Sequence, residues 1–175
     1  MAIALLTNAS QAGAANNSGV TAGASIDSSG ATLLVLVCSS YVGTAEPTPT
    51  DSKGNSWTGL TAKSTTGDGR VRIWYSIPTS VGTNHTFTYT ATNIYASICV
   101  AAFSGTAASS VYDGVENGAS SAGATSLAAG SVTPSAADHL IIYGTAAGGT
   151  WGMTPTITVV DTGGITNTVD YVSGD

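Results

Sequence analysis

Turn signals rich in Gly, Pro, Asn and Asp interrupt this chain roughly every 8–12 residues, and short runs of β-branched and aromatic residues lie between them. Charged residues make up 8% of the chain, and the long polar residues that favour helix interiors are scarce. This spacing is typical of two packed antiparallel sheets. We predict strands over the runs 32–39, 56–60, 70–75, 85–90, 95–103, 126–132, 139–143, 156–160 and 164–171.

The length of 175 residues fits a single domain. We therefore predict one all-β domain over residues 1–175, an antiparallel β-sandwich of the jelly-roll type with about eight or nine short strands. Residues 1–30 differ from the rest because they show no strong alternation, and from residue 7 onward only Val20 and Ile26 are large and apolar. We expect this part to be an N-terminal arm, or loops that lie over a sheet.

The run 70–75 alternates in a way that separates two faces of its strand. Positions 71, 73 and 75 are Val, Ile and Tyr, and the other face carries Arg70, Arg72 and Trp74. Half of the basic residues of the chain thus lie beside an indole. Either another part of the same chain covers this face, or Arg70, Arg72 and Trp74 form a contact surface for a partner, since Arg and Trp are enriched among interface hot spots.

The charge balance excludes two classes of partner. Ten acidic residues against four basic ones give a net charge of −6, so we expect no binding to nucleic acid and none to anionic membrane surfaces. The longest apolar run, residues 33–37, is far shorter than the roughly 20 residues that span a bilayer. Residues 1–6 contain no basic residue and do not resemble a secretory signal, so we expect synthesis in the cytoplasm.

No pattern of catalytic or metal-binding residues emerges, and we predict no catalytic residue, no metal and no cofactor. The Cys and His residues at 38, 85, 99 and 139 lack the spacings of metal sites. A Ser–His–Asp triad can be drawn with either histidine, but Ser and Asp are so frequent here that the match carries no weight. We expect His85 at the start of an exposed strand and His139 at the start of a buried one.

Two acidic motifs have plainer explanations than chemistry. Glu46 and Glu116 are the only glutamates, and both fall in predicted loops, so nothing supports a glycosidase-type pair. Residues 51–55 (Asp-Ser-Lys-Gly-Asn) resemble half of a calcium loop but lack the downstream Glu. A tight turn explains them better, because Asp bonds the backbone two residues on and Gly and Asn tolerate positive φ.

Cys38 and Cys99 each lie inside an apolar run. Two buried thiols that pack as small hydrophobic groups are the favoured interpretation. A disulfide between two sheets is the alternative, and the sequence leaves this choice open.

Four segments together resemble a group of jelly-roll proteins from tailed bacteriophages: residues 51–57 (DSKGNSW), 71–75 (VRIWY), 102–105 (AFSG) and 111–114 (VYDG). The resemblance spans residues 30–145, and Phe103 stands where many members have an acidic residue. Several members are capsid decoration (cement) proteins. The resemblance implies a homotrimer on the outer surface of the virion, made in the host cytoplasm, whose partner is the major capsid protein. It implies no catalytic residue.

Two other functions remain as alternatives. A carbohydrate-binding or adhesive module of a tail fibre or surface protein would use exposed aromatic rings, for which the candidates are Tyr41, Trp57, Trp74 and Trp151. A hydrolase on a jelly-roll scaffold ranks third, because no catalytic set is visible. Selective binding on a glycan array, lost on a single Trp→Ala change, would favour the carbohydrate module.

Overall fold

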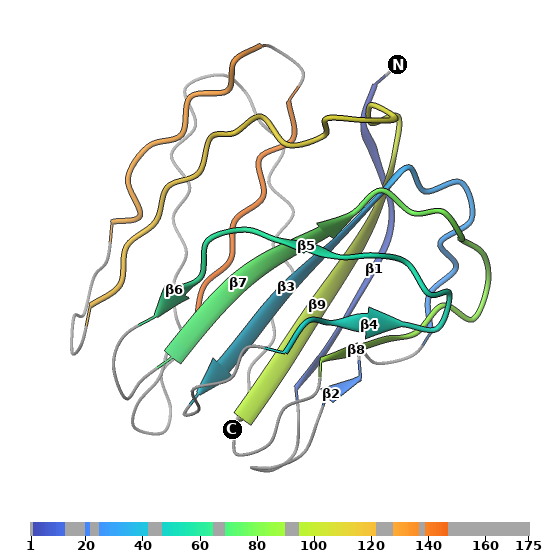
Figure 1. Ribbon diagram of the computed structural model, residues 1–175, viewed down its shortest axis with the longest axis horizontal. Helices are drawn as coiled ribbons and strands as arrows, with labels where there is room; N and C mark the ends of the chain where they lie inside the picture. The colour runs from blue at the N-terminus through green and yellow to red at the C-terminus, as the bar shows by residue number, and fades with distance from the viewer. Residues whose placement is uncertain are drawn as a thin grey trace.

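The computed structural model describes residues 2–12, 20–21, 25–41, 47–64, 69–89, 95–121, 128–136 and 139–146. These residues form nine strands in two antiparallel sheets (Figure 1). The larger sheet has the order β1 (Ala4–Ala12), β9 (Tyr95–Ser104), β3 (Leu33–Tyr41), β7 (Gly69–Ser76) and β5 (Thr58–Gly59), and β6 (Lys63–Ser64) also pairs with β7. The smaller sheet has the order β2 (Val20–Thr21), β8 (Phe87–Tyr89) and β4 (Thr50–Asp51).

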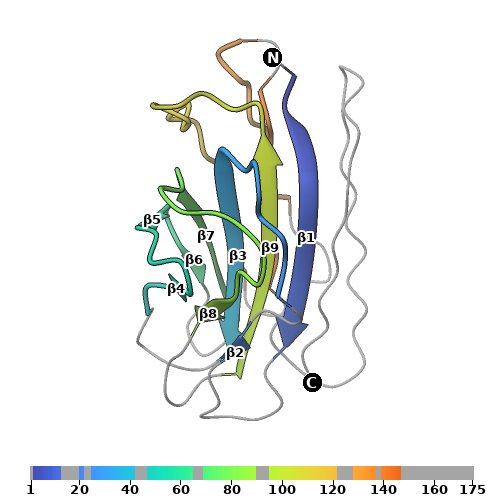
Figure 2. The same ribbon diagram turned by 90° about the vertical axis from the view of Figure 1, so that its right-hand side faces the viewer.

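The central strand β3 is buried on both faces because a layer of chain covers each face of the larger sheet. Leu34 and Leu36 point toward the smaller sheet, where they pack with Phe87 and Tyr89 of β8. Figure 2 shows the smaller sheet lying on this side of the larger one. Each such buried aliphatic side chain contributes roughly 1.5–3 kcal/mol to folding.

The opposite face of the larger sheet is covered by chain that follows β9. Leu33, Val35 and Phe103 on this face pack with Val111 and Ile142. Residues 139–146 cross the sheet so closely that a Cβ added at position 144 would lie 2.5 Å from Val37 Cγ1, which explains why Gly stands there.

The predicted all-β antiparallel sandwich is confirmed, and the finer jelly-roll type stays a prediction. The strands predicted over 32–39, 70–75 and 95–103 match β3, β7 and β9 to within two residues at each end. The runs 56–60 and 85–90 form only the short strands β5 and β8. The predicted strands over 156–160 and 164–171 lie outside the described residues.

Two predictions about individual segments are wrong. Residues 4–12 are not part of an N-terminal arm, because they form β1 and pair with β9 from Ala4 opposite Ser104 to Ala12 opposite Ser97. Residues 139–143 form no strand. Their apolar side chains are half-buried by packing on the face of the larger sheet, with Ile142 in contact with its core, so they need no partner strand. Residues 128–132, part of another predicted strand, also form none.

The two cysteines form no disulfide, and the sheet register gives the reason. Cys38 of β3 lies opposite Ile98, whereas Cys99 lies opposite Val37. Because successive side chains of a strand point to opposite faces, the two thiols lie on opposite sides of the sheet. Cys38 belongs to the core between the sheets, and Cys99 is half-buried on the other face.

Candidate functional site

A buried polar network at one end of the sandwich is the most concentrated chemistry in the described residues, and its centre is Asp51. One carboxylate oxygen, Oδ1, accepts hydrogen bonds from the Lys53 backbone N–H at 2.8 Å and from Asn55 Nδ2 at 3.2 Å, and lies 3.0 Å from His85 Nε2. The other, Oδ2, accepts a 2.9 Å bond from the indole N–H of Trp57. The tight turn predicted over residues 51–55 is confirmed. We call Ser28, Asp51, Asn55, Trp57 and His85 the Asp51 network.

Gly54 makes this turn sterically accessible. Its φ of 74° lies in the left-handed region, which glycine adopts without strain. The turn thereby brings Asn55 back toward Asp51, and places Trp57 so that its ring meets Phe87 edge-on, with the centroids 6.1 Å apart. The spacing of Asp, Asn and Trp at positions 51, 55 and 57 therefore has a purely local geometric reason.

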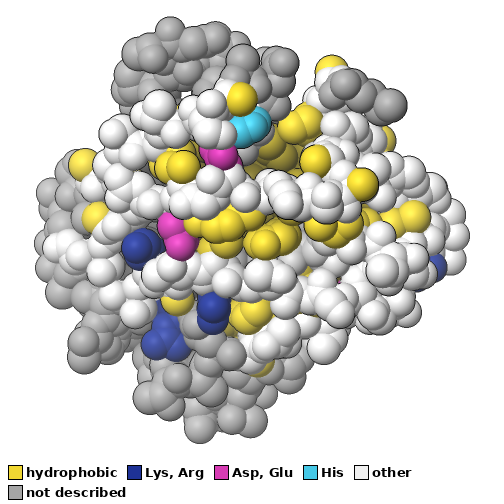
Figure 3. All heavy atoms as spheres, turned by 45° about the horizontal axis from the view of Figure 1, so that its top comes forward, with side chains coloured by type: hydrophobic (Ala, Val, Ile, Leu, Met, Phe, Trp, Pro, Cys, Tyr) yellow, Lys and Arg dark blue, Asp and Glu magenta, His cyan; other side chains and the backbone are white. Residues whose placement is uncertain are grey.

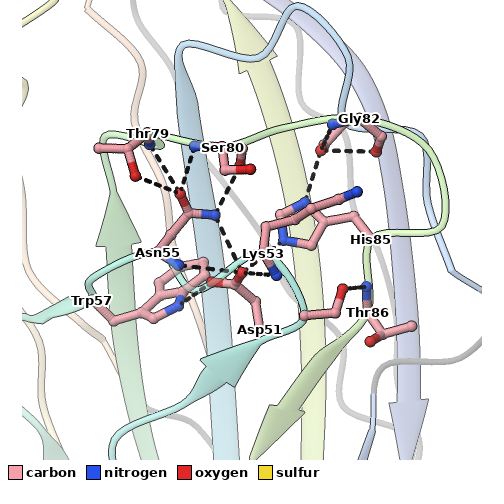
Figure 4. A network of polar contacts seen from close by, with 11 residues as sticks. Asp51, Lys53, Asn55, Trp57, Thr79, Ser80, Gly82, His85 and Thr86 are labelled. Atoms are coloured by element: carbon pink, nitrogen blue, oxygen red, sulfur yellow. Dashed lines mark hydrogen bonds and ion pairs between the residues drawn. The ribbon is translucent and has the colours of Figure 1, made fainter.

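Asn55 fixes the loop that connects β7 to β8. Its side-chain oxygen accepts hydrogen bonds from the backbone N–H groups of Thr79 at 2.9 Å and Ser80 at 3.0 Å, and its Nδ2 donates to the Ser80 carbonyl at 3.0 Å. Figure 4 shows the Asn55 side chain pointing toward both residues. A buried amide that satisfies its donors and its acceptor in this way rigidifies the segment it contacts.

Ser28 and His85 extend the network to a third segment of the chain. Ser28 Oγ lies 2.7 Å from His85 Nδ1, accepts the Gly82 N–H at 3.0 Å and donates to the Gly82 carbonyl at 3.2 Å. Backbone hydrogen bonds between Ile26 and His85 join the same two segments. The His85 ring stacks on Phe87 with the centroids 4.2 Å apart. The prediction of an exposed His85 is wrong, because this side chain is fully buried.

Ser28, His85 and Asp51 are joined in the order found in serine hydrolases, yet the arrangement is structural. All three side chains have an exposed fraction of 0%, so no substrate carbonyl reaches Ser28 Oγ. That oxygen is also occupied by both backbone groups of Gly82. A nucleophile must be accessible to the bond it attacks. These residues therefore hold three loop segments together.

The electrostatics of Asp51 follow from the same contacts. Burial of the carboxylate acts to raise its pKa, but the hydrogen bonds from His85, Lys53, Trp57 and Asn55 together outweigh burial. The pKa of Asp51 therefore lies below the usual value for an aspartate. The group is ionised at neutral pH and acts only as an acceptor, as the donors around it require.

The contact surface predicted from Arg70, Arg72 and Trp74 is covered by the chain itself. Trp74 has an exposed fraction of 5% and belongs to the core between the sheets, so its prediction as a surface residue is wrong. The Arg72 guanidinium lies 4.4 Å from the centre of the Trp74 ring, and its Nε donates to the Leu60 carbonyl at 2.6 Å. Arg70 is half-buried, at a position between β3 and β6.

The segment that covers these side chains approaches them through Gly59 of β5. A Cβ at this position would lie 2.7 Å from both Arg72 Nε and Trp74 Cζ3. Only glycine permits this approach without displacement of the side chains beneath it. The alternation along β7 correctly put Arg72 and Trp74 on one face, but it carried no information on what covers that face.

The carboxylates considered for glycosidase chemistry are not shown as a pair. Glu116 accepts hydrogen bonds from Thr61 Oγ1 at 2.6 Å and from the Thr61 N–H at 3.1 Å, which tie residues 112–118 to the segment between β5 and β6. These hydrogen bonds lower the pKa of Glu116. Glu46 lies outside the described residues.

His139 lies at the surface, where it was predicted to be buried. Its side chain is 36% exposed, and Nδ1 lies 3.2 Å from Asp113 Oδ2. The same carboxylate accepts a hydrogen bond from the Ser135 N–H at 2.8 Å, so Asp113 joins two neighbouring segments of the layer over the sheet. Hydrogen bonds from Ser135 lower the pKa of Asp113.

Among the described residues, no group of three or more His, Cys, Asp or Glu is placed to hold a metal ion. The aromatic platforms proposed for sugar binding are also reduced. Trp74 is in the core, and Trp57 is half-buried against Phe87 with its N–H donated to Asp51. The Tyr41 side chain and Trp151 lie outside the described residues.

Comparisons with protein-family models, with curated proteins and with solved structures found no match. In the described part of the chain, no helix is long and apolar enough to cross a membrane.

Proposed function

We propose that this chain is a virion structural protein: a decoration (cement) protein that binds the outer surface of a mature tailed-phage capsid as a trimer. In this role it clamps neighbouring subunits of the major capsid protein. Synthesis in the host cytoplasm and a final location on the outer surface of the shell belong to the same proposal. The sequence resemblance of four segments is its starting point: residues 51–57, 71–75, 102–105 and 111–114.

The observation that carries the proposal is the use to which the resembling residues are put. Asp51, Asn55 and Trp57 supply the buried network that fixes the loops, and residues 71–75 lie within β7, next to the central strand. Their reactive groups are spent on holding the scaffold rigid. A protein built in this way acts through the surfaces that the scaffold presents, which favours a passive binding role.

The mechanism of stabilisation is linkage. A protein that binds only the expanded shell stabilises that shell by mass action, by about 2.7 kcal/mol per site when its concentration is a hundred times Kd. Three copies around one axis add avidity, because the second and third contacts form at the high effective concentration set by the first. The low charge of the chain suits contacts made mainly by apolar groups and neutral hydrogen bonds.

Co-sedimentation with capsid shells tests the proposal. The shells are assembled from the major capsid protein encoded in the same genome, in both expanded and unexpanded forms. We expect saturable binding to expanded shells, little binding to unexpanded ones, and a bound stoichiometry in multiples of three. Light scattering on the bound and released protein gives its mass, expected at three times 17.2 kDa. Absence of binding to expanded shells would contradict the proposal.

A further inference from the structure

The connection between β7 and β8, residues 77–84, is an irregular loop whose backbone two buried side chains fix from below. Asn55 bonds the backbone of Thr79 and Ser80, and Ser28 bonds both backbone groups of Gly82. Ser28 is fully buried and Asn55 is 8% exposed, so water competes little for these hydrogen bonds. Loop 77–84 therefore holds one conformation before any partner arrives.

This rigid loop presents aliphatic side chains to solvent. Ile77 is 40% exposed and Val81 is 37% exposed. Both side chains are β-branched and have few rotamers to lose. A fixed backbone that carries stiff apolar side chains loses little conformational entropy on association, and this raises the affinity obtained from a given contact area.

The surroundings of loop 77–84 are nearly uncharged. The sheet register places Leu5, which is 41% exposed, at the same level as Ile77, because Leu5 lies opposite Phe103, Phe103 opposite Leu33, and Leu34 opposite Ser76. Residues 104–110, at the same end of the sheet, contain no charged residue, and neither does loop 77–84. Figure 3, which brings the N-terminal end of the sheet forward, shows mostly hydrophobic and uncharged polar side chains.

The charges beside this surface are few and opposite in sign. Lys53 lies next to the loop, with its ammonium 3.6 Å from the point that a Cβ at Gly82 would occupy, and it interacts electrostatically with Asp27. A polyanion requires a cluster of cations, and sugar binding commonly uses an exposed aromatic ring; loop 77–84 has neither. The surface fits an uncharged, partly apolar protein surface.

We propose that the end of the sandwich formed by loop 77–84 and the start of β1 is the face that docks on the capsid shell, with Ile77 and Val81 as its anchors. The occupant is an uncharged, partly apolar patch on the major capsid protein. This inference rests on the proposed function and adds which surface makes the contact.

Paired substitutions on the full chain test the docking face. Ile77→Ser with Val81→Ser removes the two anchors, and Val115→Ser with Val132→Ser is a matched control, since these residues are 40% and 37% exposed on the layer over the other face of the sheet. In co-sedimentation with expanded shells, we expect the first variant to bind roughly tenfold more weakly or worse, and the control to bind like the unchanged chain. Unfolding in urea verifies that both variants are folded.

The outcomes separate this inference from the function on which it rests. Binding of the unchanged chain together with full binding of the Ile77/Val81 variant would overturn the docking face alone. Equal weakening of the control variant would overturn it as well, because the effect would then not be specific to this end. Absence of binding by the unchanged chain would overturn both proposals. Asn55→Ala, which leaves both anchors in place, should also weaken binding and speed amide hydrogen exchange at Thr79 and Ser80.

Discussion

Replacement of Asp51 by Asn tests the structural role of the Asp51 network. The change keeps the shape of the side chain but removes its charge and replaces one acceptor oxygen by an NH₂ group. If the amide oxygen keeps the contacts of Oδ1, the new NH₂ faces the Trp57 N–H, which Oδ2 now accepts at 2.9 Å. Rotation of the amide would instead place the NH₂ against Lys53, Asn55 and His85, so either orientation leaves donors facing each other.

The magnitude follows from these contacts. A buried donor left without an acceptor costs about 1–3 kcal/mol, and hydrogen bonds to a charged group are worth roughly 1 kcal/mol more than bonds to a neutral one. We expect Asp51→Asn to lower the free energy of unfolding by about 2–4 kcal/mol. With an m-value of about 1–3 kcal/mol/M, the urea midpoint should fall by about 1–2 M.

The assay is equilibrium unfolding in urea at pH 7, followed by the fluorescence of Trp57 and the other tryptophans. Asp113→Asn is the matched control, because Asp113 is also hydrogen-bonded by its neighbours but lies at the surface. The control should leave the midpoint close to that of the unchanged chain. Equal midpoints for Asp51→Asn and Asp113→Asn would refute the reasoning, since burial would then make no difference.

Three further predictions follow from the same structure. Gly59→Ala should lower the free energy of unfolding by about 1–3 kcal/mol, because the new methyl group would overlap the Trp74 ring; urea unfolding measures it, and an unchanged midpoint would show that the strand is free to shift. The lowered pKa of Asp51 contributes stability that is complete above the unfolded-state pKa of about 4 and is lost as the pH falls through the folded-state value, so Asp51→Asn should flatten this acid limb in urea titrations between pH 2 and 6; parallel limbs would contradict it. Cys38 and Cys99 should both react with a thiol reagent in denaturant without prior reduction, and a count of zero would mean a disulfide.

The strands that could be predicted are those whose pattern is decided by burial. β3 is a continuous apolar run because both of its faces are covered, and β7 alternates because its two faces meet different layers. β1 escaped prediction because its Ala, Asn, Ser and Gln residues show no alternation, and its pairing with β9 is a long-range choice. The run 139–143 misled in the opposite way, since its apolar residues cover the sheet without joining it.

The candidate site was predictable only in part. The turn at 51–55 follows from Asp, Gly and Asn, whose local preferences act within five residues. The partners of that turn come from far along the chain: Ser28 and His85 are separated by 57 positions. A lone His beside a Phe in an alternating run carries no sign of burial. The one available hint is that position 85 has the parity of Phe87 and Tyr89, the inward residues of the same run.

Scanning calorimetry of expanded shells with and without this chain tests the central claim most directly. The account predicts that saturating protein raises the melting temperature of expanded shells and leaves unexpanded shells unchanged, because only the mature form offers the binding face. The shift should grow with the concentration of added protein until the sites are full. An unchanged melting temperature of expanded shells at saturating protein would contradict the assignment as a decoration protein.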